Sequence, residues 1–121
     1  MASESTGAKA QLSVLNGRSK GATLEMSQRR EYTVGRSGNT DLQLRDPPVS
    51  RVHCKIEFDG DYFWLIDNGS ANGTLVNEQR VQRYMLYDGD TITLGKTDIQ
   101  FRITEPPEEK SNAQIPMEPQ G

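Results

Sequence analysis

The chain has 121 residues, a length that suits one small domain. No apolar run approaches the roughly 20 residues that cross a bilayer, and the start lacks the apolar stretch of a secretory signal, so we expect a cytoplasmic protein without membrane contact. Residues 10–104 carry 12 basic and 12 acidic side chains, so the net charge of −3 comes from the two ends. A neutral body argues against nucleic acid as a partner.

Short segments of alternating apolar and polar residues follow one another along the body. The predicted strands cover residues 11–15, 22–26, 31–34, 41–44, 53–58, 62–67, 74–76, 91–94 and 99–103. Glycine, asparagine and aspartate separate most of these segments, and no helical period lasts beyond a turn or two. Many short strands at this spacing predict an all-β fold, an antiparallel β-sandwich.

Such a sandwich buries one face of each sheet, and the alternation supplies candidate core residues. These are Leu24, Val34, Leu42, Leu44, Ile56, Phe58, Trp64, Ile66, Ile92, Leu94, Ile99 and Phe101. The single cysteine, Cys54, excludes an internal disulfide and is predicted to be a buried structural thiol.

The two ends differ from the body in composition. Residues 1–9 are small and polar and are predicted to form a disordered N-terminal tail. Residues 105–121 hold four of the six prolines and are predicted to be a Pro/Glu-rich disordered tail or linker. The folded domain is therefore expected to span residues 10–104.

Four short motifs occur at junctions between predicted strands and loops. In chain order they are Gly35-Arg36, Ser50-Arg51-Val52-His53, Asn72-Gly73-Thr74 and Asp88-Gly89-Asp90. A guanidinium group offers a planar fork of donors that matches a phosphate, and a serine hydroxyl can donate to a phosphate oxygen. An asparagine amide donates and accepts, so it can clamp the backbone of an extended peptide.

In this order and spacing the motifs resemble those of the forkhead-associated (FHA) domain, a phosphothreonine-recognition sandwich of about eleven short strands with an FHA/SMAD-like fold. The resemblance covers roughly residues 10–104. It implies a phosphopeptide-binding module that recognises phosphothreonine on a partner protein in kinase-dependent signalling. The phosphopeptide-binding residues that it implies are Arg36, Ser50, Arg51 and Asn72. The residues that it implies as structural support of the site are Gly35, His53, Gly73 and Thr74.

The chain departs from the FHA pattern at one position. Many FHA domains carry serine or threonine directly before the Asn-Gly pair, where this chain has Ala71. Ser70 precedes it, but the period-two alternation of an extended chain aims Ser70 elsewhere. One hydrogen bond to a charged group, worth about 1.5–3 kcal/mol, is then missing. This gap keeps an alternative open, a phosphate-independent protein–protein interaction scaffold on the same fold.

The pair Ser50 and His53 also raises the question of catalysis. A serine nucleophile needs an imidazole base within reach, a third orienting group and an oxyanion hole, and no such set is visible, so we expect no enzyme. One histidine without neighbouring ligands and an Asp-Gly-Asp turn predict no metal site, and no cofactor is expected. A phosphorylated Thr6 in the N-terminal tail is a further candidate ligand for the site, in cis or in trans.

Overall fold

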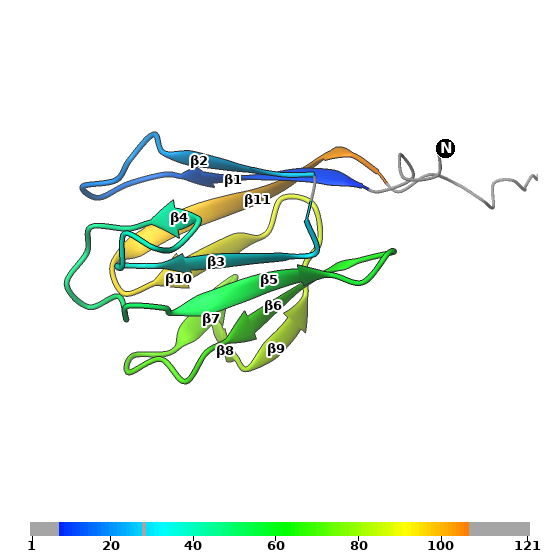
Figure 1. Cartoon of the computed structure of the whole chain (residues 1–121). Coiled ribbons are helices and arrows are strands. Elements are labelled where there is room, and N and C mark those ends of the chain that lie inside the picture. The colour runs from blue at the N-terminus through cyan, green and yellow to red at the C-terminus, as the bar shows by residue number, and fades with distance from the viewer. Residues whose placement is uncertain (1–7, 28, 107–121) are drawn as a thin grey trace, which may run out of the picture.

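A computed structural model describes residues 8–27 and 29–106, so the segments 1–7 and 107–121, including Thr6, lie outside the described residues. The described chain forms eleven strands (Figure 1). They are β1 (Lys9–Val14), β2 (Thr23–Met26), β3 (Glu31–Gly35), β4 (Leu42–Gln43), β5 (Cys54–Phe58), β6 (Phe63–Asp67), β7 (Thr74–Val76), β8 (Gln79–Val81), β9 (Arg83–Met85), β10 (Thr91–Leu94) and β11 (Thr97–Glu105). Among these residues no helix is long and apolar enough to span a bilayer.

The strands form two sheets that pack face to face. One sheet has six strands in the order β2-β1-β11-β10-β7-β8, and the other has five in the order β4-β3-β5-β6-β9. All pairs are antiparallel except β3 and β4, which run parallel. The predicted all-β sandwich of about eleven strands is therefore confirmed. β1 begins at Lys9 and β11 ends at Glu105, one residue outside the expected span of 10–104 at each end.

Two strands, β8 and β9, were not among the predicted segments. β7 and β8 form a hairpin whose turn residues, Asn77 and Glu78, both have left-handed backbone conformations with φ of 50° and 74°. Two left-handed residues are typical of the tight hairpin turn that usually carries glycine. Because Glu78 stands where glycine is usual, the sequence carries a weak hairpin signal. After Gln82 the chain crosses to the other sheet as β9.

The core lies between the sheets and is joined across them by aromatic rings. Phe63 on β6 and Phe101 on β11 have ring centroids 5.6 Å apart at 61°. Of the twelve predicted core residues, eight are buried in the core: Val34, Leu42, Leu44, Ile56, Ile92, Leu94, Ile99 and Phe101. Leu24 and Phe58 are partly buried and pack against it.

The prediction that Trp64 and Ile66 belong to the core was wrong. Successive side chains of a strand point to opposite faces, and in β6 the inward positions are Phe63 and Leu65, which are 3% and 0% exposed. Trp64 lies on the outer face, where its indole nitrogen donates to Asp59 at 2.8 Å and the Arg83 guanidinium stands 4.0 Å from its ring. Cys54 is buried as predicted, and burial, followed by the nearby Asp67 carboxylate, raises the pKa of its thiol.

Candidate functional site

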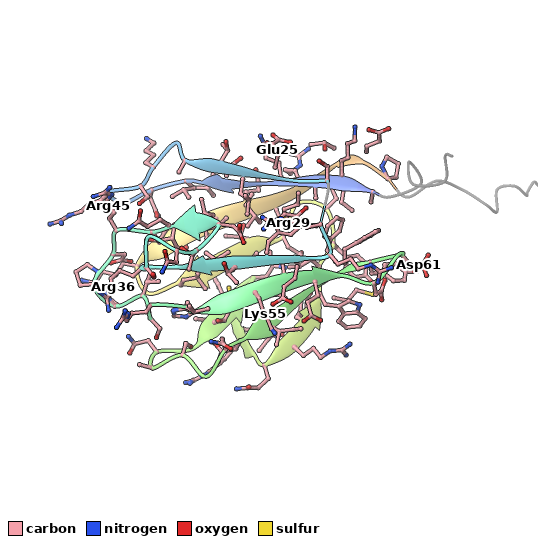
Figure 2. The ribbon with its side chains drawn as sticks, viewed as in Figure 1. Glu25, Arg29, Arg36, Arg45, Lys55 and Asp61 are labelled. Carbon is pink, nitrogen blue, oxygen red and sulfur yellow. The ribbon has the colours of Figure 1, made fainter. Side chains whose placement is uncertain are left out.

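The first three motifs meet at one end of the sandwich. β3 ends at Gly35, β5 begins at Cys54 and β7 begins at Thr74, and the antiparallel pairing brings these three termini to the same end. Figures 1 and 2 show the loops that carry Arg36 and Arg45 gathered there, with Asp61 at the opposite end. The fourth motif, Asp88-Gly89-Asp90, forms the turn before β10.

Backbone hydrogen bonds fix Arg36 against the loop that carries Ser50. The Arg36 amide donates to the Ser50 carbonyl at 3.0 Å, and the Ser37 amide donates to the Arg51 carbonyl at 3.1 Å. The side chain adds a bond, since Nε of Arg36 donates to the carbonyl of Val49 at 3.0 Å. One edge of the guanidinium is thereby anchored, while its two terminal nitrogens have no hydrogen-bond partner among the described residues.

The hydroxyl of Ser50 joins two loops. The Ala71 amide donates to Ser50 Oγ at 3.0 Å, which ties the loop before β5 to the loop before β7. The hydroxyl accepts in this bond, so its own proton is free to be donated outward. Ser50 is half-buried beside the exposed Arg36. Arg36 and Ser50 are therefore held on neighbouring segments, and each keeps a hydrogen-bond donor that can bind a ligand.

Asn72 is exposed and its amide is anchored on one side only. Nδ2 donates to the carbonyl of Pro48 at 2.8 Å. The second N–H and the Oδ1 atom have no partner among the described residues, so the amide retains one donor and one acceptor. Pro48 also precedes Val49, whose carbonyl holds Arg36. Arg36 and Asn72 are thus positioned by adjacent carbonyls of one segment.

His53 is completely buried and uses both ring nitrogens within the fold. The Ser50 amide donates to Nδ1 at 3.0 Å, so Nδ1 is the unprotonated nitrogen. Nε2 lies 2.8 Å from the Gly73 carbonyl, to which it must donate. These partners assign the Nε2–H tautomer. His53 therefore ties the Ser50 loop to the Asn72 loop.

Two glycines are needed for the conformation of these loops. A Cβ on Gly35 would lie 2.2 Å from the Arg51 carbonyl oxygen, a distance that no side chain tolerates. Gly73 has φ of +86°, in the left-handed region, and a Cβ there would lie 2.7 Å from the Arg80 side chain. Gly35 is required by this close approach, and Gly73 by its left-handed backbone, because the flexible Arg80 side chain can move aside.

A carboxylate that the sequence did not single out organises the loop before β7. Asp67 accepts from the Ser70 hydroxyl at 2.6 Å and from the Thr74 hydroxyl at 2.7 Å. Ser70 Oγ in turn accepts from the Gly73 amide at 2.9 Å. Burial alone would raise the pKa of Asp67, but these hydrogen bonds hold it below its ordinary value. The only available signal was the spacing Asp67-x-x-Ser70, which is typical of a side-chain-capped turn.

The remaining predicted residues are also placed. Arg51 is exposed, and its side chain makes no hydrogen bond or ion pair with the described residues. Asp90 accepts from the Asn77 amide group and from the Tyr87 backbone, and Asp88 accepts from Arg102 and the Ile103 backbone. Both aspartates therefore order the far end of the sheets. Within the described residues no group of three His, Cys, Asp or Glu side chains is arranged to hold a metal ion.

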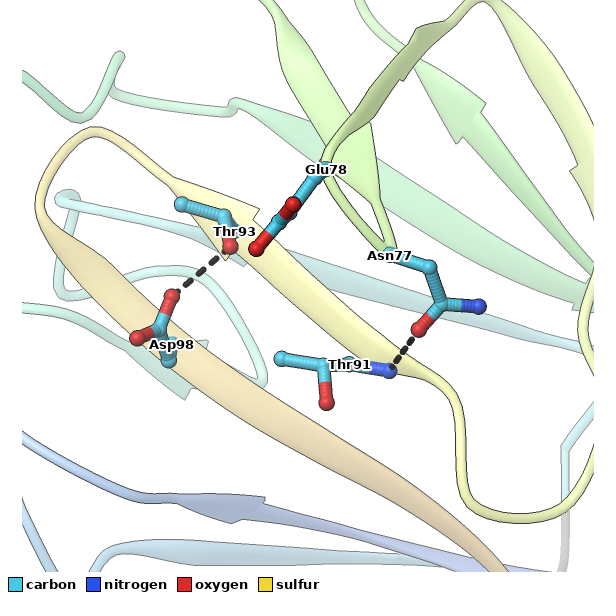
Figure 3. A pocket seen from close by; sticks show the side chains of 5 residues that line it. All are labelled: Asn77, Glu78, Thr91, Thr93 and Asp98. Atoms are coloured by element: carbon cyan, nitrogen blue, oxygen red, sulfur yellow. Dashed lines mark hydrogen bonds between the residues drawn. The ribbon is translucent and has the colours of Figure 1, made fainter.

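A polar hollow of about 330 Å³ lies away from these loops, on the outer face of the six-stranded sheet. The residues that line it are Asn77, Glu78, Thr91, Thr93 and Asp98 (Figure 3). Thr93 donates to Asp98 at 2.7 Å, and the Thr91 amide donates to Asn77 at 3.0 Å. The hollow contains none of the motif residues. The candidate site is therefore the end of the sandwich where Arg36, Ser50 and Asn72 lie, which we call the loop end.

Comparison with known proteins agrees with this arrangement. The family model described as FHA domain matches residues 32–95. The FHA domain-containing protein FhaA of Mycobacterium tuberculosis is 43% identical over 70 residues, which are 58% of this chain and 13% of FhaA. The glycogen accumulation regulator GarA of Mycolicibacterium smegmatis is 36% identical over 81 residues, 67% of this chain and 51% of GarA. The chain thus spans at most about half the length of these relatives.

Solved structures show the same likeness. One, described as a structural and functional analysis of phosphothreonine-dependent FHA domain interactions, superposes with a TM-score of 0.72 at 36% identity and covers 78% of this chain and 95% of its own. The FhaA FHA domain in complex with the intracellular domain of Rv3910 gives a TM-score of 0.70 at 36% identity, over 77% and 99% of the two chains. The motifs, the two-sheet topology and these matches show that the chain belongs to the FHA domain family.

Proposed function

We propose that Arg36, Ser50 and Arg51 hold the phosphate of a phosphothreonine peptide while Asn72 fixes the peptide backbone. The chain is an FHA domain, a module of phosphopeptide recognition in signalling, and its partners are phosphothreonine-containing proteins. One observation supports the residue assignment most strongly. Arg36, Ser50 and Asn72 are each anchored by one hydrogen bond within the fold and each retains polar atoms that no described residue occupies.

The anchoring favours binding because it removes part of the entropic cost of ordering side chains around a ligand. A phosphate accepts charge-assisted hydrogen bonds, which are shorter and stronger than neutral ones. Arg36 has two terminal nitrogens for such bonds and Ser50 has one hydroxyl proton. Arg51 is exposed beside them and adds a second positive charge.

We infer binding without catalysis, because the Ser50 hydroxyl is not paired with the imidazole. It is the backbone amide of Ser50, and not its hydroxyl, that bonds to His53 Nδ1, and Nε2 bonds to a carbonyl. A base that activates a serine must accept the proton of its hydroxyl. His53 is also fully buried, with no access for a substrate.

The test is titration with three matched peptides that carry phosphothreonine, phosphoserine or threonine at one position. We expect measurable binding of the phosphothreonine peptide and loss of at least about tenfold in affinity for Arg36→Ala, since a hydrogen bond to a charged group is worth about 1.5–3 kcal/mol. Arg30→Ala is the matched control, because Arg30 is an exposed arginine directly before β3, at the opposite end of that strand from Arg36.

Two results would count against this assignment. Equal binding of the three peptides would show that the phosphate is not recognised. Unchanged capture of a protein partner by the double variant Arg36→Ala, Ser50→Ala would favour the alternative, a phosphate-independent interaction scaffold on the same fold.

A further inference from the structure

The charged side chains of the described residues are paired unevenly over the molecule. Four cations, Lys9, Arg29, Lys55 and Arg102, form ion pairs with carboxylates. None of them lies in the loops that carry the motifs. At the loop end the exposed cations have no acidic partner among the described residues. They are Arg18, Lys20, Arg36, Arg45, Arg51, Arg80 and Lys96.

Three carboxylates on the neighbouring segments accept hydrogen bonds from neutral donors. Asp46 accepts from the Lys96 amide at 2.8 Å and from the Thr97 hydroxyl at 2.9 Å. Asp98 accepts from the Asn16 amide group at 2.9 Å and from the Thr93 hydroxyl at 2.7 Å. Asp67 is occupied by Ser70 and Thr74 in the same way. The cations are therefore left to interact with a ligand, although these carboxylates reduce the net potential of this end.

Arg45 and Lys96 are joined to the peptide site through Pro48. Asn72 donates to the Pro48 carbonyl, and a Cβ on Gly95 would lie 3.0 Å from Pro48 and 3.1 Å from Asp46. Lys96 follows Gly95, and Arg45 precedes Asp46. We call the exposed pair Arg45 and Lys96, which flanks residues 46–48, the basic ledge. Figure 2 shows Arg45 at the same end as Arg36, with its side chain directed outward.

We propose that the basic ledge selects phosphothreonine peptides that carry further anionic side chains, carboxylate or phosphate, on the flank that passes Pro48. This inference rests on the proposed function, because Asn72 must first hold the peptide backbone. The proposal places the peptide chain beyond Asn72 over Pro48, whose carbonyl Asn72 contacts, where an extended peptide advances about 3.3 Å per residue toward the ledge. Exposed ion pairs are individually weak, and two of them predict a gain of about threefold to tenfold that falls with added salt.

The test compares a phosphothreonine peptide with neutral flanks, one with aspartates before the phosphothreonine and one with aspartates after it. Each is titrated against the wild type, the ledge variant Arg45→Ala, Lys96→Ala and the charge-matched control Arg30→Ala, Arg102→Ala. We expect one aspartate-bearing peptide to bind the wild type about threefold to tenfold more tightly than the neutral peptide. This advantage should vanish in the ledge variant only. A phosphoserine in place of the most effective aspartate then shows which anion is preferred.

The possible negative results separate the proposed function from the ledge proposal. If the neutral phosphothreonine peptide does not bind the wild type, the proposed function fails and the ledge proposal fails with it. If that peptide binds but aspartates add nothing, the ledge proposal alone is wrong. It is also wrong if both double variants lose the advantage equally, because that result assigns the effect to overall charge.

Discussion

The Ala71 amide donates to the Ser50 hydroxyl over 3.0 Å. Ala71 has no hydroxyl for a ligand, but its backbone positions the hydroxyl of Ser50. This bond fills one acceptor site of Ser50 and leaves its proton to point toward solvent. Ala71 contributes through its backbone, and its own methyl group is exposed. The departure from the FHA pattern therefore removes one donor without removing the framework of the site.

Substitution of Ser50 by alanine is expected to weaken phosphothreonine binding by about tenfold to a hundredfold. The change removes a hydrogen bond to a charged group, worth about 1.5–3 kcal/mol, and leaves the Ala71 amide without its partner. Calorimetric titration with one phosphothreonine peptide measures the loss. Ser50→Thr keeps the hydroxyl and is the control. Equal affinities of wild type and Ser50→Ala would remove Ser50 from the site.

Substitution of Ala71 by serine is expected to strengthen binding by about threefold to tenfold. The new hydroxyl lies beside Ser50 and supplies the missing donor, at the cost of ordering one more side chain. Ser70→Ala is the informative comparison, because the Ser70 hydroxyl is already engaged with Asp67 and Gly73. That variant should lose stability in urea unfolding. A gain in affinity from Ser70→Ala, with none from Ala71→Ser, would reverse this interpretation.

The strands could be predicted from the sequence where alternation was clean, and the failure in β6 shows the limit. Residues 62–66 are apolar or aromatic at every position, so a period of two does not choose the buried face. What chooses it is a contact between sheets, the packing of Phe63 on Phe101. The outer Trp64 is then covered by Arg83, from a strand that the sequence did not reveal.

The sequence predicts the residue types of the candidate site, and it does not predict their hydrogen-bond partners. The positions of Arg36, Ser50 and Asn72 follow from motif order, because strand ends converge. Their anchors, the carbonyls of Val49 and Pro48, are backbone atoms whose direction depends on the tertiary fold. The contribution of Asp67 was missed for the same reason, since both Ser70 and Thr74 must turn toward it.

Gly35→Ala is expected to disturb both stability and binding. The added methyl would lie 2.2 Å from the Arg51 carbonyl, so the loop before β5 must move. Overpacking of this kind costs about 1–3 kcal/mol. The same movement displaces the bonds that join Arg36 to Ser50. Gly38→Ala is a matched control in the same loop, because its nearest neighbour would be 3.9 Å away. Urea unfolding and peptide titration should separate the two variants, and equal behaviour would contradict the predicted clash.

His53 is expected to be in the Nε2–H tautomer. Nitrogen NMR of the imidazole measures this directly, and a protonated Nδ1 would contradict the bond from the Ser50 amide. The two hydrogen bonds of the His53 ring also predict that His53→Ala lowers the free energy of unfolding by about 3 kcal/mol. The substitution opens a cavity and leaves the Ser50 amide and the Gly73 carbonyl unpaired. His53→Gln retains an amide that can satisfy one of them and should be less destabilised. Equal losses would argue that packing alone is responsible.

The lowered pKa of Asp67 predicts that the stability of the fold depends on pH. Its pKa in the folded chain is below the ordinary value of 3.8, after burial is outweighed by the bonds from Ser70 and Thr74. The unfolded chain therefore binds the proton more readily, and the stabilisation is complete above the unfolded pKa and is lost as pH falls through the folded one. Asp59 and Asp88, with pKa values also lowered, act in the same direction.

Asp67→Asn isolates the contribution of this carboxylate from that of the other aspartates. The variant keeps the shape of the side chain but has no charge to lose, so it should be less stable than the wild type at about pH 6, where the carboxylate is ionised. The difference between their free energies of unfolding should shrink as the pH falls toward about 3. Urea unfolding across this range measures it. A difference that stays constant or widens at low pH would show that the ionised carboxylate is not what holds the loop before β7.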